Sequence, residues 1–127
     1  MRIEVTQLPP VEYSPNWRGH WSRRYHAGRQ YQGDVYYSCV DARNRALGEG
    51  MSLPFTTAVL NLCFIFPQHR HRDRDNLIGQ FKPGLDALVQ AGLLLDDDSE
   101  HLHIGDVSIL VNRKQAPLTI IELEEKQ

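Results

Sequence analysis

Residues 72–98 read RDRDNLIGQFKPGLDALVQAGLLLDDD, a helix-like segment with a group of aspartates at each end. Asp73 and Asp75 follow a strand-like run over residues 56–66, and an extended backbone would point both side chains to one face. The second group occupies residues 96–98. Carboxylates from two loops can converge on one point, and oxygen ligands suit Mg2+ or Mn2+ better than zinc. The stretch therefore predicts a divalent-cation site.

Hydrophobic patterning predicts the secondary structure of the whole chain, because strands alternate apolar and polar residues while helices repeat apolar residues every three or four positions. The expected elements are, in order, a strand over 2–7, a helix over 23–47, a strand over 56–66, a helix whose apolar stripe covers 77–89, and strands over 102–113 and 118–124. This order predicts a single α+β domain over residues 1–127, with a small mixed β-sheet packed against two helices on one side.

Charge is unevenly distributed along the 127 residues, although the formal net charge is only −2. Residues 1–82 contain eleven Lys or Arg against seven Asp or Glu, whereas residues 83–127 contain three against nine. Within residues 17–45, six arginines face only two aspartates. A phosphate group would interact with this local excess of positive charge, which matters more for binding than the net charge of the chain. The charge distribution therefore favours a nucleic-acid partner.

Membrane insertion and secretion are not indicated by the sequence. No apolar run approaches the roughly 20 residues of a membrane span, and the first residues lack the layout of a signal peptide. Cys39 and Cys63 stand 24 residues apart without a C-x-x-C motif, so we expect buried free thiols. These features predict a cytoplasmic protein with no membrane partner.

The motif order in residues 72–98 resembles that of a known enzyme family. Asp-x-Asp-Asn-Leu is followed by a lysine, Leu-Asp-Ala-Leu, Ala-Gly and a final Asp-Asp. This order resembles the RusA family of Holliday junction resolvases, which are crossover junction endodeoxyribonucleases. Outside this core the similarity is one of layout, with a basic, aromatic N-terminal part and a β-rich C-terminal part. The resemblance implies a RusA-like fold, hydrolysis of phosphodiesters at four-way DNA junctions, Mg2+ with Mn2+ as a substitute, a homodimer, and a bacterial, phage or prophage origin.

The resemblance further implies that Asp73, Asp75 and Asp97 are catalytic carboxylates that bind the metal. A structural interpretation competes at the first two positions, because an aspartate shortly before Leu77 is also favourable at a helix N-terminus. The two interpretations are compatible, since one carboxylate can cap a helix with one oxygen and face a metal with the other.

The lysine departs from the commonest family pattern, which places it at the position of Gly79. Lys82 lies three residues later and keeps the family's four-residue spacing to Asp86. At about 100° per residue, Lys82 lies roughly 20° around the helix from Asp75, so it remains a catalytic candidate. Alternatively, Lys82 only pairs with Asp86, whose own role is better interpreted as structural. We also expect a kink near Gly79, because Pro83 clashes with the carbonyl group four residues before it.

Basic residues occur in two segments suited to DNA. Arginines alternate with aromatic residues over residues 16–37, where cations can contact phosphates and aromatic faces can stack on bases, although some aromatics must belong to the core. A basic rim is expected beside the acidic site. The DNA-binding candidates are Arg18, Arg23, Arg24 and Arg29 in the first segment and His69, Arg70, Arg72 and Arg74 in the rim.

Histidine pairs at residues 69 and 71 and at residues 101 and 103 have spacing that suits zinc. We favour the rim over zinc, because cysteine is absent nearby and the family assigns no metal role to these positions.

Together these features predict a metal-dependent, structure-selective endodeoxyribonuclease. Two alternatives remain open. One is a non-catalytic branched-DNA-binding relative of the same fold, which the displaced lysine keeps in consideration. The other is a metal-dependent hydrolase of smaller phosphoesters, for which a segregated basic face would be unnecessary.

Overall fold

The structure is a computed structural model and describes residues 1–126. Its elements are β1 (Arg2–Val5), a 3-10 turn η1 (Val11–Tyr13), α1 (Trp21–Gly48), β2 (Ala58–Phe66), α2 (Arg74–Gln80), α3 (Lys82–Gln90), β3 (Leu102–Val111) and β4 (Leu118–Glu125). The predicted order is confirmed, except that the expected second helix is two helices, α2 and α3.

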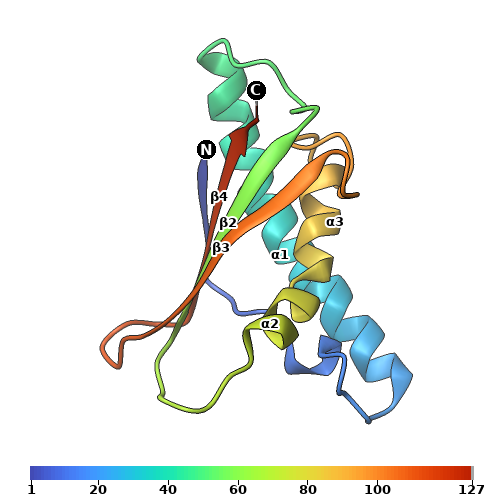
Figure 1. Cartoon of the computed structure of the whole chain (residues 1–127), viewed down its shortest axis with the longest axis vertical. Helices are drawn as coiled ribbons and strands as arrows, with labels where there is room; N and C mark the ends of the chain where they lie inside the picture. Colours follow the sequence, from blue (N-terminus) through green and yellow to red (C-terminus); the bar gives the residue numbers. More distant parts are fainter. Residues whose placement is uncertain (127) are drawn as a thin grey trace.

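The strands form one mixed sheet in the order β1-β4-β2-β3. β2 pairs with β3 in parallel, whereas β4 is antiparallel to both β1 and β2. The helices lie on one face of this sheet (Figure 1), where side chains such as Leu60, Phe64 and Ile121 are fully buried. The opposite face carries partly exposed residues such as Asn61 and Cys63. The predicted class, an α+β domain with a small mixed sheet, is confirmed.

Helix α1 supplies the largest cover of the core. Its buried residues recur every three or four positions, at Gly28, Tyr31, Val35, Cys39, Ala42 and Ala46. The helix starts at Trp21, slightly earlier than predicted, because the His20 ring nitrogen Nδ1 accepts a hydrogen bond from the Ser22 backbone N–H. The N-terminal turns of α1 extend past the sheet (Figure 1), and α1 also packs against η1.

The break between α2 and α3 lies at Phe81, two residues beyond the expected kink at Gly79. Pro83 sits in the first turn of α3, where its missing N–H leaves no helical hydrogen bond unmade. Phe81 is almost fully buried, and its ring packs edge-on against Tyr31 and Phe64. Gly79 instead provides a close approach, because a Cβ there would lie 2.9 Å from Cγ of Pro15.

Two further expectations concern membranes and thiols. None of the helices in residues 1–126 combines the length and apolar character needed to cross a membrane. Cys39 and Cys63 are both free; Cys39 is buried as expected, whereas Cys63 lies partly exposed on the open face of the sheet. Burial raises the pKa of the Cys39 thiol to about 12, so this thiol is unreactive at neutral pH.

Candidate active site at the start of α2 and α3

Asp73 and Asp75 lie at the N-terminus of α2. Asp73 is the N-cap residue, and its Oδ1 accepts a hydrogen bond from the Asp75 backbone N–H at 2.8 Å. Asp75 belongs to the first helical turn, and its side chain is 88% exposed. The expectation that an extended backbone carries both side chains is therefore wrong, because the helix already begins at Arg74. The alternative prediction of a helix-capping aspartate is confirmed for Asp73.

Lys82 joins the start of α3 to the loop that follows this helix. Its ammonium Nζ lies 2.5 Å from Oδ2 of Asp97 and 2.9 Å from Oδ1 of Asp86. Burial lowers the pKa of Lys82, but the hydrogen bonds to Asp97 and Asp86 outweigh it and raise this pKa above its ordinary value. Lys82 is therefore a cation at neutral pH. The two sequence-based interpretations of Lys82 do not exclude each other, since it contacts both aspartates.

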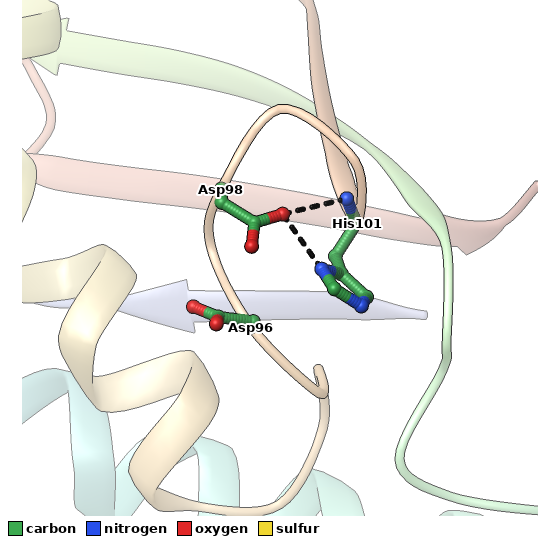
Figure 2. A group of neighbouring side chains, drawn as sticks. All are labelled: Asp96, Asp98 and His101. Carbon is green, nitrogen blue, oxygen red and sulfur yellow. Dashed lines mark hydrogen bonds and ion pairs between the residues drawn. The ribbon is translucent and has the colours of Figure 1, made fainter.

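A second acidic group, formed by Asp96, Asp98 and His101, lies in the loop before β3 (Figure 2). One potential ligand atom from each of these side chains lies within 4.8 Å of the others. Asp98 Oδ1 accepts hydrogen bonds from the backbone N–H groups of Glu100 and His101, both at 3.0 Å, and from His101 Nδ1 at 2.6 Å. This oxygen therefore accepts three hydrogen bonds from the turn that precedes β3. The closeness of Asp98 and His101 is thus explained by the structure of the turn.

The hydrogen bond between Asp98 and His101 shifts the pKa values of both groups. It raises the pKa of the His101 imidazole and lowers the pKa of the Asp98 carboxyl. Sequence reasoning considered His101 only in a zinc motif and missed this pair. The signal that could have revealed it is the three-residue spacing, because an aspartate commonly accepts hydrogen bonds from backbone N–H groups two or three residues later in a turn.

The carboxylates of Asp73, Asp75 and Asp97 do not form a comparable cluster, since within residues 1–126 the group around His101 is the one whose potential ligand atoms all lie within 4.8 Å of one another. Their chemistry nevertheless fits Mg2+, because all three offer oxygen ligands. Mg2+ is commonly held by one or two carboxylates together with waters and substrate phosphates. Asp73 and Asp75 are linked by the hydrogen bond from the Asp75 backbone N–H to Asp73 Oδ1, while Asp97 is held by Lys82.

The arginines at the N-terminus of α1 differ in their engagement. The guanidinium of Arg24 lies 4.1 Å from the centre of the Tyr13 ring and donates a hydrogen bond to the Ser14 carbonyl at 2.8 Å. Arg23 packs more loosely, with its guanidinium 5.5 Å from the Trp17 ring centre. Both side chains therefore help to hold the N-terminal loop against α1, and their DNA-binding role stays a prediction.

The basic rim contains one arginine with a clear structural task. The guanidinium of Arg72 lies 3.6 Å from the centre of the Phe66 ring, and its Nη1 donates to the carbonyl groups of Gln68 at 3.0 Å and Arg70 at 3.2 Å. Partial burial and the nearby charge of Arg70 lower the pKa of Arg72. Arg72 thus fixes the shape of the β2–α2 loop. The predicted DNA-binding residues that are exposed are Arg18, Arg23, Arg29, His69, Arg70 and Arg74.

Comparison with known proteins places the chain in a family without revealing its chemistry. No protein-family model matches the sequence. A protein of the bacterium Xylella fastidiosa (strain Temecula1), described as uncharacterized, is 36% identical over 113 residues, which cover 81% of this chain and 71% of that protein. The chain belongs to the same family as that protein. The bacterial source of this relative agrees with the origin expected from the sequence.

Proposed function

We propose that this protein is a metal-dependent, structure-selective endodeoxyribonuclease that resolves four-way DNA junctions, as its resemblance to the RusA family implies. The observation that carries the proposal is the contact of Lys82 Nζ with Asp97 Oδ2 at 2.5 Å. The lysine lies three residues beyond the commonest family position, yet it contacts the aspartate that the resemblance identifies as catalytic. The contact supports Lys82 as the functional equivalent of the family lysine.

The proposed metal ligands are Asp73, Asp75 and Asp97, and the ion is Mg2+, with Mn2+ as a substitute. When bound, the ion would supply positive charge at the scissile phosphoryl group. Asp73 keeps its capping hydrogen bond through Oδ1 and has Oδ2 for this task. Asp75 needs no rearrangement of the core, because its side chain is already exposed to solvent.

Lys82 acts in this proposal as a fixed positive charge. Its raised pKa keeps the ammonium protonated at neutral pH, which makes it unsuitable as a general base. The two aspartates hold the ammonium in place, so little reorganisation is needed when negative charge develops on the phosphoryl oxygens. A charge that interacts more strongly with the transition state than with the bound substrate raises the cleavage rate more than it raises affinity.

The exposed basic residues would contact the DNA backbone outside the site. Arg18 and Arg29 flank the start of α1, and Arg70 and Arg74 flank the proposed ligand Asp73. A four-way junction has near two-fold symmetry and is resolved by nicks in two opposed strands. The proposal therefore includes a homodimer with one site in each subunit.

A cleavage experiment tests the proposal directly. The purified protein is incubated with an end-labelled synthetic four-way junction in Mg2+, Mn2+ or EDTA, with a linear duplex of matching sequence as the control. The expected result is paired, symmetric nicks in the junction in Mg2+ or Mn2+, with little cutting of the duplex. A folded protein that leaves the junction intact in both ions would contradict the proposal.

One observation favours a second candidate, a non-catalytic protein that binds branched DNA. Asp73, Asp75 and Asp97 are not gathered within the 4.8 Å found for the group around His101. A gel-shift experiment in Ca2+ separates the candidates when it is combined with the cleavage assay. Tight binding of the junction without cutting in Mg2+ would support the non-catalytic candidate. Equal binding of junction and linear duplex would instead favour a hydrolase of smaller phosphoesters.

A further inference from the structure

A cavity of about 510 Å³ opens beside Asp73. It lies between the N-terminal loop, the end of β2, the β2–α2 loop and the face of α2 that carries Asn76, Leu77 and Gln80. In Figure 1, the β2–α2 loop extends beyond the end of the sheet. Its volume lies within the range of about 300–1,000 Å³ that is typical of small-molecule sites. The cavity on the open face of the sheet, at about 190 Å³, is much smaller.

Part of the cavity lining is apolar. Leu8 and Val11 contribute from the N-terminal loop, Leu77 from α2 and Phe66 from the end of β2. Leu77 and Phe66 are buried, and the guanidinium of Arg72 covers the Phe66 ring at 3.6 Å. Arg72 also donates hydrogen bonds to two carbonyl groups of the β2–α2 loop, which fix the shape of the loop that lines the cavity.

The cavity is also lined by polar and charged groups. Arg70, His71 and Asp73 line it from the β2–α2 loop, and the amides of Asn76 and Gln80 line it from α2. Gln80 is 8% exposed and donates a hydrogen bond from Nε2 to the Pro9 carbonyl at 3.4 Å. The Asn76 side chain makes no hydrogen bond to any of residues 1–126, and its amide offers both donors and an acceptor to a ligand.

We propose that this cavity, called the base pocket below, holds one unpaired nucleotide of the DNA next to the scissile phosphate. The apolar wall suits the face of a planar base, and the amides of Asn76 and Gln80 suit the hydrogen-bonding groups on its edge. Arg70 and His71 are placed to meet its phosphate. Asp73 lines the same cavity, so a base held there brings its own phosphate toward this proposed metal ligand.

This inference rests on the proposed function and deepens it by giving a physical source of structure selectivity. Extruding a base from a continuous duplex means breaking its pairing and stacking, whereas a base that is already unpaired gives up much less. Unstacked nucleotides at a branch point would therefore enter the base pocket more readily than nucleotides of a linear duplex. The pocket would discriminate between these DNA structures without reading a long sequence.

A binding experiment with a defined probe tests the base pocket separately from cleavage. The probe is a hairpin duplex with a single-nucleotide bulge of 2-aminopurine, compared with the fully paired hairpin, in Ca2+. The test variant is Val11→Trp, which fills the pocket from a side chain that is 65% exposed. The control is Leu47→Trp, which adds an indole at the far end of α1, where the side chain is 49% exposed.

The wild-type protein is expected to prefer the bulged probe by at least about tenfold, because a bulged base has already lost pairing and stacking that would otherwise cost a few kcal/mol to break. Val11→Trp should remove the preference while leaving affinity for the paired hairpin unchanged, and Leu47→Trp should retain it. Asn76→Ala provides a second test that does not fill the cavity, and it should weaken binding of the bulged probe alone. Thermal unfolding checks that each variant is folded.

The possible failures are distinguishable. Equal binding of both probes by the wild-type protein, or a preference that survives Val11→Trp, overturns the base pocket even when the junction is cut. A preference that Val11→Trp abolishes, in a protein that does not cut the junction, supports the pocket and overturns the proposed nuclease. If Val11→Trp instead abolishes dimer formation in sedimentation experiments, the cavity belongs to a contact between two copies of the chain, and the nucleotide proposal falls.

Discussion

Replacing Lys82 by alanine tests the contact on which the proposed mechanism depends. The substitution removes an ammonium that is held 2.5 Å from Asp97 and 2.9 Å from Asp86. If this charge stabilises the transition state, Lys82→Ala should lower the single-turnover cleavage rate by at least about tenfold, equivalent to about 1.4 kcal/mol of barrier. Junction affinity should change little, because the ammonium is already paired with carboxylates in the free protein.

The effect on stability should be smaller than the effect on the rate. The lysine side chain is 47% exposed and the Asp86 side chain 43% exposed, so their i,i+4 pair contributes only about 0.3–0.5 kcal/mol. The pair with Asp97, whose side chain is 20% exposed, contributes about 1 kcal/mol at most after solvent screening. Lys82→Ala should therefore remain folded at assay temperature, and its rate can be compared with that of the wild-type protein.

The matched control is Asp86→Asn, which keeps a polar side chain of similar shape and leaves the contact between Lys82 and Asp97 intact. It should lose about 0.3–0.5 kcal/mol of stability and cleave within about twofold of the wild-type rate. The assay uses excess protein over a labelled junction, so that the rate reports one round of cleavage. Equal rates for Lys82→Ala and the wild-type protein would refute the catalytic role. Equal rate losses in both variants would show that the loss comes from breaking the Lys82–Asp86 pair, and would also refute a direct catalytic role of the Lys82 charge.

Three further predictions concern other parts of the site. Asp75→Asn should abolish cleavage while junction affinity in Ca2+ stays equal or increases, because the amide removes a proposed metal ligand and a negative charge near phosphates; wild-type turnover in Mg2+ would exclude Asp75 from the mechanism. Arg24→Ala should lower the free energy of unfolding by about 1–2 kcal/mol, because it loses a hydrogen bond to a carbonyl group and a contact with an aromatic ring. Arg29→Ala should instead reduce the slope of log affinity against log salt concentration by about 0.9. Chemical denaturation measures the first effect and salt titration the second; a stability loss in Arg29→Ala with a changed salt slope in Arg24→Ala would contradict the structural role of Arg24 and the DNA-binding role of Arg29. The pKa of the His101 imidazole should lie above its ordinary value of 6.5 and fall in Asp98→Asn, as measured by NMR titration. Because the pKa of His101 is raised and that of Asp98 is lowered from 3.8, the pair stabilises the protein between these two ordinary values and loses this contribution as the pH rises through the raised His101 pKa or falls through the lowered Asp98 pKa; an unshifted imidazole would refute the contact.

Much of the fold follows from local patterns in the sequence. The continuous apolar run of β2 and the three-to-four-residue spacing in α1 predict these elements, because each pattern reports a buried face directly. The order of the strands could not be predicted, since pairing joins segments far apart in the chain. The break at Phe81 was placed two residues too early for a related reason. Pro83 marks a disturbance, but the packing of Phe81 against Phe64 and Tyr31 fixes where the helix ends.

The site was predictable where it depends on a few residues close together in sequence. Asp73 caps α2 as local helix chemistry suggests, and Lys82 contacts Asp86 at the expected four-residue spacing. The tasks of Arg24 and Arg72 were missed, because both side chains bond to backbone carbonyl groups, which every residue offers. The base pocket was missed as well, since its walls come from segments that only the folded chain brings together.

The position of β4 between β1 and β2 has a consequence for how the chain folds. In the described sheet, β1 pairs with β4 alone, so the β1 residue Ile3 can pair with Ile121 only after β4 has been synthesised. On the ribosome, the first strand therefore emerges long before its partner, and closing such a long loop precedes any gain from the contacts. Until β4 arrives, one edge of β2 also lies open to other chains. We expect the sheet to form only after β4 has been synthesised, with aggregation as the main competing outcome when translation stops before β4.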